Sequence, residues 1–371
     1  MLSIDAKKLE RLQGEELLST LEQEAIRCGI SDIHFNPQKT GVKIEWRELG
    51  LLTTLLTITH DTFDSVQRRI KFKAKLKLNL TTVAQDGQYT FPTGGRMVNV
   101  RVASLPSRFG EAFTLRLLDP QRGIVPLEKL GFPEDIRKNI QTIAELPNGL
   151  VLVTGPTGSG KTTTLYALLS TLAGKDRNII TLEDPIEYEL KDIIQSQIDV
   201  EHGYTFASGL RAILRHDPDI ILVGEIRDQE TAQTAIDASL TGHLVFATLH
   251  TNSAIEAIPR LLSMGVSSYT FAPALRAVLA QRLVRTINPE LRATIADHTE
   301  AEPLYYTGQL ALPEFLIGTE AIKNLILSQA PSAEIMATAK KEGFRTMKEY
   351  GEQLIKEVVT SRAEVARVTA I

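Results

Sequence analysis

The sequence is poor in cysteine and in long apolar runs. Cys28 is the only cysteine among 371 residues, which excludes an internal disulfide and a zinc site made of several cysteines. No stretch approaches the roughly 18 to 20 apolar residues that span a bilayer. Residues 1–8 lack the apolar region of a secretory signal. We therefore expect a cytoplasmic protein that reaches a membrane only through partners.

A strong excess of charge of either sign is also absent. The net charge is −4, with 23% charged and 43% hydrophobic residues, which is typical of a globular protein. This mildly acidic total is not that of a dedicated nucleic-acid binder. A chain of this length is expected to form two or three domains.

The N-terminal part predicts a small α+β domain over residues 1–118. A helical apolar stripe over 14–29 is followed by alternating, strand-like runs. Arg69–Leu78 alternates lysines with apolar residues, which predicts an edge strand; a basic helix is the alternative. Its lysines are read as a solvated face or as a patch for nucleic acid or anionic lipid. Residues 85–88 predict a hairpin turn, and the Pro- and Gly-containing stretch 119–135 predicts an interdomain linker.

The stretch Gly155–Thr162 reads GPTGSGKT and matches the phosphate-binding pattern G-x-x-x-x-G-K-[ST]. A continuous apolar run precedes it, and apolar residues at helical spacing follow it. Glycines let backbone N–H groups turn toward phosphates, and the helix N-terminus adds the positive end of its dipole. Lys161 is expected to reach the β- and γ-phosphates, and the Thr162 hydroxyl to bind Mg²⁺. The predicted nucleotide contacts are Gly155, Thr157, Gly158, Ser159, Gly160, Lys161, Thr162 and Thr163.

Three further apolar runs alternate with helical patterns and predict strands at 178–182, 219–223 and 243–248. This alternation is typical of a parallel sheet with crossover helices. Each run ends in polar residues, and the carboxyl ends of parallel strands meet at the edge where ligands bind. The predicted α/β core covers 136–290, and we expect residues 291–371 to be mainly helical.

Acidic residues follow two of these runs. Hydrolysis of a triphosphate needs a carboxylate that orients or activates water, and cations on the γ-phosphate. Glycine stands at 224, where many such ATPases have aspartate, so Glu225 is the acid of that strand and is expected to act on Mg²⁺ through water. Considered one at a time, each of these acids is as compatible with a structural role, as a helix cap or an ion-pair partner, as with a catalytic role. The candidates are Glu183, Asp184, Glu187 and Glu225.

Four motifs in this order resemble the ATPases of type II secretion and type IV pilus assembly. They are the P-loop, the acidic box 181–188, the Walker B segment 217–227 and the histidine box 241–252. Ser31–His34, Gln85–Gly87 and Arg101–Asp119 extend the resemblance over most of the chain. It implies a RecA-like P-loop ATPase core after a PAS-like α+β domain, with a helix where alternation predicts a strand at 69–78.

The same resemblance implies roles for particular residues and for partners. The roles are a general base at Glu187, a Walker B glutamate at Glu225, histidines near the γ-phosphate at His243 and His250, and arginines from the N-terminal domain at Arg101 and Arg116. Family members form homo-hexameric rings that use ATP and Mg²⁺. Their domains move around the ring and act on a platform protein at the inner face of the cytoplasmic membrane, without binding nucleic acid directly.

Residues 238–242, 264–266 and 281–285 resemble the assembly branch more than the retraction branch. Two features depart from that branch: residues 288–312 hold no cysteine, so no zinc is expected, and the long N-terminal docking domain is absent or was removed. The alternatives are a pilus retraction ATPase, a nucleic-acid-translocating RecA-like motor and a scaffold that does not hydrolyse ATP.

Overall fold

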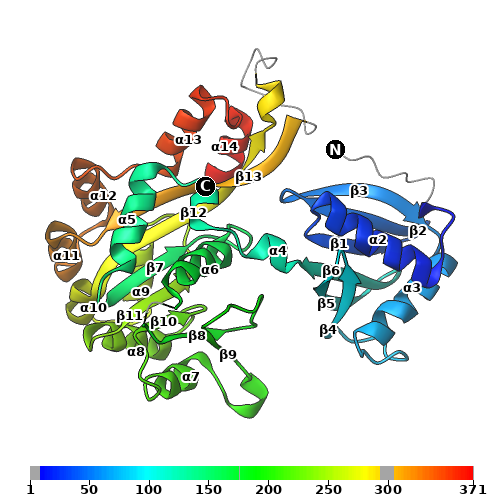
Figure 1. The fold of residues 1–371 in the computed structure, drawn as a ribbon, viewed down its shortest axis with the longest axis horizontal. Helices are drawn as coiled ribbons and strands as arrows, with labels where there is room; N and C mark the ends of the chain where they lie inside the picture. Colours follow the sequence, from blue (N-terminus) through cyan, green and yellow to red (C-terminus); the bar gives the residue numbers. More distant parts are fainter. Residues whose placement is uncertain (1–8, 175, 293–304, 371) are drawn as a thin grey trace. The chain divides into compact units, whose positions relative to one another are not determined.

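The chain forms two compact units, residues 1–123 and 124–371, in a computed structural model that describes residues 9–174, 176–292 and 305–370 (Figure 1). The division falls inside the segment predicted as a linker. That segment contains helix α4 (Pro120–Gly123) and the short 3-10 helix η1 (Leu127–Lys129). Residues 1–8, whose sequence lacks the apolar region of a secretory signal, lie outside the described residues.

The N-terminal unit is an antiparallel sheet with two helices packed on its apolar face. The six strands follow the order β3-β2-β1-β6-β5-β4. Alternate residues of the strands and the apolar faces of both helices share one core, as the predicted α+β domain requires. The strands are β1 (Asp32–Gln38), β2 (Gly41–Glu48), β3 (Leu51–Ile58), β4 (Gln85–Thr93), β5 (Arg96–Ser107) and β6 (Gly110–Leu118), and the helices are α2 (Gly14–Cys28) and α3 (His60–Lys73).

Helix α2 confirms the apolar stripe predicted for 14–29. It ends at Gly29, which has a φ of 76°, a left-handed conformation that glycine adopts without strain. Cys28 is half-buried in the last turn of α2, and burial raises the pKa of its thiol. A raised thiol pKa disfavours the reactive thiolate, in agreement with a packing role.

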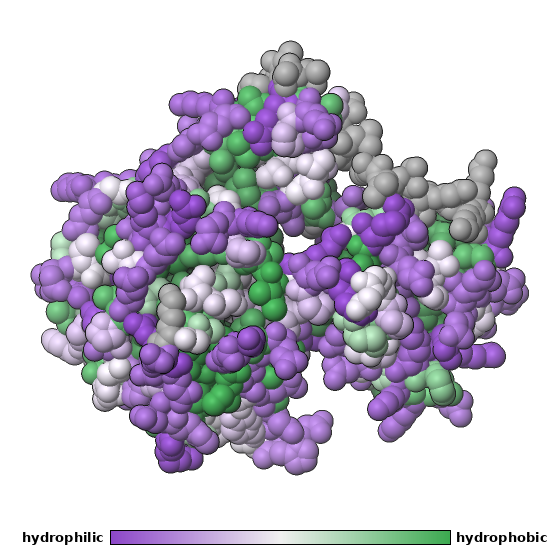
Figure 2. Space-filling view, viewed as in Figure 1, coloured by the Kyte–Doolittle hydropathy of each residue, from purple (hydrophilic) through white to green (hydrophobic). Residues whose placement is uncertain are grey.

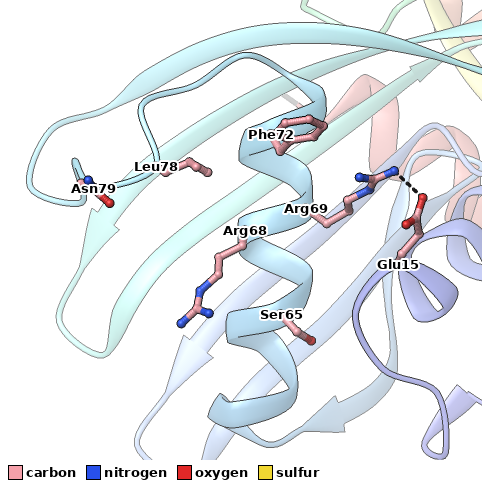
Figure 3. Close-up of a pocket in the computed structure, with 7 residues that line it drawn as sticks. All are labelled: Glu15, Ser65, Arg68, Arg69, Phe72, Leu78 and Asn79. Atoms are coloured by element: carbon pink, nitrogen blue, oxygen red, sulfur yellow. Dashed lines mark hydrogen bonds and ion pairs between the residues drawn. The ribbon is translucent and has the colours of Figure 1, made fainter.

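The strand predicted for Arg69–Leu78 is wrong. Residues up to Lys73 continue α3, and Ala74 is its C-cap residue. Figure 3 shows Arg68, Arg69 and Phe72 on this helix and Leu78 in the loop that follows it. The lysines alternate, but the buried apolar residues recur every three or four positions, and burial of that face decides the structure. These buried residues are Phe63, Val66, Ile70 and Ala74. The helix implied by the family resemblance is confirmed as far as Lys73, where α3 ends.

Three of the five basic residues of this segment form ion pairs inside the unit. The ion pairs join Arg69 with Glu15, Lys71 with Glu111 and Lys73 with Glu22. The pair of Lys71 and Glu111 is buried, with both side chains 1% exposed and 2.6 Å between Nζ and Oε2. Basic side chains that pair with acids of the same unit contribute less positive charge to the surface. This favours a structural role for Arg69–Leu78 over nucleic-acid binding.

The hairpin turn predicted at residues 85–88 is also wrong. These residues begin β4, and its turn into β5 lies at Gly94 and Gly95. Gly87 is a close-approach position: a Cβ there would lie 2.7 Å from Leu76 Cδ2 and closer still to the carbonyl oxygen of Ala74. The glycine lets the chain after α3 pass over the sheet.

We expect Gly87→Ala to destabilise the N-terminal unit by about 1–3 kcal/mol, because the new methyl group meets backbone that cannot withdraw like a flexible side chain. Thermal unfolding followed by circular dichroism measures the loss. Gln88→Ala changes an exposed neighbour on the same strand and serves as the control. Equal melting temperatures for the two variants would contradict this account of Gly87.

The second unit is built on a seven-stranded sheet with the order β13-β12-β7-β11-β10-β8-β9. All neighbours pair in parallel except β12 and β13, which are antiparallel. The strands are β7 (Gly149–Thr154), β8 (Ile179–Glu183), β9 (Ile194–Gln197), β10 (Ile220–Val223), β11 (Leu244–Leu249), β12 (Leu275–Ile287) and β13 (Tyr306–Ile317). The central strands β7, β10 and β11 are buried on both faces, which explains their continuous apolar runs.

Helices surround this sheet (Figure 1). They are α5 (Glu134–Ala144), α6 (Lys161–Leu172), α7 (Phe206–Ile213), α8 (Gln229–Leu240), α9 (Ala257–Ser263), α10 (Ser268–Ala274), α11 (Glu320–Leu327), α12 (Ser332–Lys341), α13 (Met347–Lys356) and α14 (Arg362–Thr369). The described residues of the range 291–371 are mainly helical, in agreement with the prediction, with one correction. They also contain β13, which extends the core sheet because its apolar residues pack on it.

The visible surface of both units is mostly hydrophilic (Figure 2). Among the described helices, none combines the length and the apolar character required to cross a membrane.

Candidate functional site

The P-loop joins the carboxyl end of β7 to the start of α6. Gly155, Gly158 and Gly160 have φ values of 147°, 78° and 87°, which side-chain-bearing residues rarely adopt. A Cβ at Gly155 would lie 2.5 Å from the Ser159 hydroxyl, whereas nothing lies within 4 Å of one at Gly158. The Ser159 Oγ is buried and has no hydrogen-bond partner in the described chain. An open, glycine-lined loop with a spare buried hydroxyl at a helix N-terminus fits a phosphate group.

Lys161 is the cation of this loop. Its Nζ donates hydrogen bonds to the carbonyl oxygens of Gly155 (2.8 Å) and Pro156 (3.1 Å). Burial lowers the pKa of Lys161 to about 8, while the carboxylates of Glu225 and Glu187 act in the opposite direction. Both predicted catalytic acids therefore lie within electrostatic reach of the P-loop lysine, although they follow different strands.

Glu225 follows β10 and is mostly buried. Its side chain is 15% exposed and pairs with Arg227, and its Oε2 lies 3.8 Å from Nε2 of His250. The preceding Gly224 explains the missing aspartate, because a Cβ there would lie 2.9 Å from the Leu182 carbonyl oxygen. The backbones of β8 and β10 approach too closely at this point for any side chain.

Glu183 and Glu187 have different environments, which the sequence left open. Glu183 is 5% exposed and accepts hydrogen bonds from Tyr166, from Thr181 Oγ1 (2.5 Å) and from Gln195 Nε2 (3.1 Å). A carboxylate with three donors is held in place and is not available to water. Glu187 is half-buried and acts electrostatically on Lys161, which makes it the better candidate for a base. Asp184 is exposed.

The two predicted histidines lie at opposite ends of β11. His250 follows the strand, and its pKa is lowered by burial and by Lys161 and Arg227, with Glu225 opposing them. His243 precedes the strand, and its Nδ1 lies 2.9 Å from the carbonyl oxygen of Ala238. Six strand residues separate the ends, or roughly 20 Å at about 3.3 Å per residue. The placement of His243 near the γ-phosphate is thus wrong for the P-loop of its own chain.

Two site residues were missed in the sequence. Arg282 acts electrostatically on Lys161, and its Nη2 donates to the Asn252 carbonyl oxygen at 3.0 Å. Burial lowers the pKa of Arg282. The fully buried Gln281 donates from Nε2 to the Ser159 carbonyl oxygen at 2.7 Å and so supports the P-loop. The sequence signal that could have identified them is that Gln281 and Arg282 are adjacent polar residues within the mainly apolar strand β12.

The predicted arginines belong to the N-terminal unit. Arg101 on β5 and Arg116 on β6 are directly opposite each other across the two strands, so they share one face of the sheet. The Arg116 side chain is 54% exposed, and its Nε lies 2.9 Å from Asp32 Oδ1.

A parallel sheet with a glycine-rich loop, a lysine at a helix start and carboxylates at the adjoining strand ends defines a RecA-like P-loop protein of the nucleoside-triphosphate-binding class. The family model described as "Type II/IV secretion system protein" matches residues 8–367, and the chain belongs to this family.

Curated relatives agree with this assignment. Type II secretion system protein E of Pseudomonas aeruginosa is 42% identical over 376 residues, which cover 95% of this chain and 75% of the relative. Type II secretion system ATPase E of Vibrio cholerae is 40% identical over 377 residues, with 95% and 75% covered.

Solved structures share the fold. The pilus retraction motor PilT with bound ADP has 30% identity and a TM-score of 0.69, over 96% of this chain and 97% of that one. The ATPase DotB of Legionella pneumophila has 23% identity and a TM-score of 0.76, over 97% of each chain, and supports the fold alone.

Proposed function

We propose that this chain is an ATP-hydrolysing motor that powers assembly of a type II secretion pseudopilus or a type IV pilus. The observation that carries the proposal is the P-loop at the carboxyl end of β7, with three glycines at positive φ and Lys161 at the start of α6. Glu187 and Glu225 both act electrostatically on Lys161. Membership of the secretion family and the names of the curated relatives support the cellular role.

Each residue has a part in the hydrolysis that we propose. The P-loop N–H groups bind the phosphates, and Lys161 neutralises charge on the β- and γ-phosphates. Glu187 accepts a proton from the water whose oxygen attacks the γ-phosphorus, as the bond from phosphorus to the ADP oxygen breaks. His250 and Arg282 add polar and positive groups beside Lys161.

The Thr162 hydroxyl would bind Mg²⁺ directly, and Glu225 would act on the ion through water, since Mg²⁺ prefers oxygen ligands. Within the described ranges, no group of three or more His, Cys, Asp or Glu side chains is placed to hold a metal. Mg²⁺ in nucleotide sites takes most of its ligands from substrate phosphates and water and only one or two from protein. When bound, the ion would offset phosphate charge.

Arg116 and Arg101 are proposed to stabilise charge on the γ-phosphate, on the basis of the family resemblance. We expect Arg116→Ala to slow ATP turnover about tenfold or more with little change in nucleotide affinity, because charge that develops during reaction loses its partner. Steady-state phosphate release and binding of a fluorescent ATP analogue measure the two quantities. Arg47→Ala is the matched control, since Arg47 also pairs with Asp32, at 3.7 Å. An unchanged rate for Arg116→Ala would remove this arginine from the mechanism.

The motor is proposed to be a homo-hexamer at the inner face of the cytoplasmic membrane. Hydrolysis would drive rigid-body motions of the two units that are passed to an inner-membrane platform protein. Membrane association would then come through partners.

Phosphate release by the purified chain with ATP and Mg²⁺, with and without the platform protein, tests the proposed function directly. Absence of release in both cases would overturn it. Stimulation by DNA or RNA, with affinity that falls steeply with salt, would instead support a nucleic-acid motor. Deletion in the native host, scored for pili, secretion and DNA uptake together, separates assembly from retraction.

A further inference from the structure

A buried polar network joins the P-loop helix to the segment that carries Glu187. Its centre is Tyr166, the largest fully buried side chain of the described residues, with 0% exposure. Tyr166 lies on α6, the helix that begins at Lys161, and its hydroxyl donates to Glu183. The same hydroxyl oxygen accepts the backbone N–H of Glu187 at 3.4 Å. One phenol therefore links a helix that starts at the P-loop to the backbone of the proposed base.

Gln195 on β9 closes this network from the other side. Its Nε2 lies 3.1 Å from Glu183 Oε1 and 3.0 Å from the carbonyl oxygen of Tyr188. Its Oε1 accepts the N–H of Leu190 at 2.7 Å. The backbone from 187 to 190 is thus tied at three points to side chains that are themselves buried or half-buried.

The protonation state of Tyr166 allows the network to support the Glu187 backbone. Burial raises the pKa of the Tyr166 hydroxyl, and Glu183 raises it further, so the phenol stays protonated and keeps donating. The buried Glu183 carboxylate in turn needs every one of its donors, because an unsatisfied buried charge is costly. Loss of one donor is expected to shift the others.

We infer that Tyr166, Glu183 and Gln195 are positioning residues that hold the Glu187 backbone in register with Lys161. The inference rests on the proposed role of Glu187 as the base. Glu187 lies in the connection between β8 and β9, outside the strand-to-strand hydrogen bonding of the sheet. Hydrogen bonds from side chains therefore hold the backbone of this connection in place. Small displacements of a catalytic group carry large costs, and about 1 Å is worth as much as a hundredfold in rate.

Tyr166→Phe removes one oxygen atom and keeps the ring. The expected result is a kcat lower by about tenfold to a hundredfold, with KM and nucleotide affinity changed less than twofold. Tyr204→Phe is the matched control, because the Tyr204 hydroxyl also forms a hydrogen bond in this region, with Ser196 Oγ at 2.6 Å. A Tyr166→Phe variant with wild-type kcat would overturn the inference.

A double variant separates positioning from general loosening of the fold. If Tyr166 acts through Glu187, adding Tyr166→Phe to Glu187→Gln lowers kcat by less than twofold further. A full additional tenfold loss would show that Tyr166 acts elsewhere and would overturn the inference. If Tyr166→Phe does not fold, Gln195→Leu replaces it, and kcat is measured for Gln195→Leu alone and combined with Glu187→Gln.

The failures of the two proposals are distinguishable. An inactive wild-type chain, with its platform partner present, would reject the proposed function. An active wild type with a slow Glu187→Gln variant and a fast Tyr166→Phe variant would reject only the positioning network.

Discussion

Replacing Glu187 by glutamine is expected to lower kcat by about 10²–10⁴-fold while ATP still binds with near wild-type affinity. Glutamine keeps the shape and the backbone hydrogen bond to Tyr166 but cannot accept the proton of the attacking water. Phosphate release under single-turnover conditions and equilibrium binding of a fluorescent ATP analogue measure the two effects separately.

Glu189→Gln is the matched control for this variant. It makes the same chemical change two positions away, at an exposed site. Normal hydrolysis by Glu187→Gln would show that the base is another residue. A loss of the same size in both variants would point to a disturbed segment and not to lost base catalysis.

Lys161→Ala is expected to abolish detectable hydrolysis and to weaken nucleotide binding, with a loss of at least about 10²–10³-fold in kcat/KM. The alanine removes the cation of the P-loop, beside which Glu187 and Glu225 would then repel the triphosphate without compensation. Isothermal titration with ATP and Mg²⁺, together with phosphate release, measures both losses.

Lys191→Ala removes an equal charge from an exposed position of the same unit and controls for net charge. The fold should persist in Lys161→Ala, since the hydrogen bonds of this side chain within the described part of the chain go to two loop carbonyls. Retained ATP hydrolysis in Lys161→Ala would mean that the loop does not bind the reacting phosphates.

The sequence alone predicted the parts of the core whose signals are local. The runs before and after the P-loop became β7 and α6, and the runs at 178–182, 219–223 and 243–248 became β8, β10 and β11. Strands buried on both faces read as unbroken apolar runs, and the P-loop pattern needs its own glycines wherever it occurs. Short β9, with its polar, half-exposed residues, carries no such signal.

The sequence-based predictions were wrong where a local pattern was compatible with two structures and tertiary packing selected one of them. Arg69–Leu78 alternates like a strand, yet burial of Ile70 and Ala74 on the helical face determined α3. The Asp-Gly pair at 86 and 87 is typical of a turn, yet Gly87 serves a close backbone contact within β4.

The sequence by itself determined what the site is made of: the glycines, the lysine and the acids that follow the strands. Only the tertiary structure decided which of those acids act electrostatically on the P-loop lysine, and that His243 and His250 lie at opposite ends of one strand. It also decided that Glu183 is a buried support held by Tyr166 and Gln195. The physical reason is that residue type follows from local chemistry, whereas burial, pKa and hydrogen-bond partners depend on neighbours that are distant in the chain.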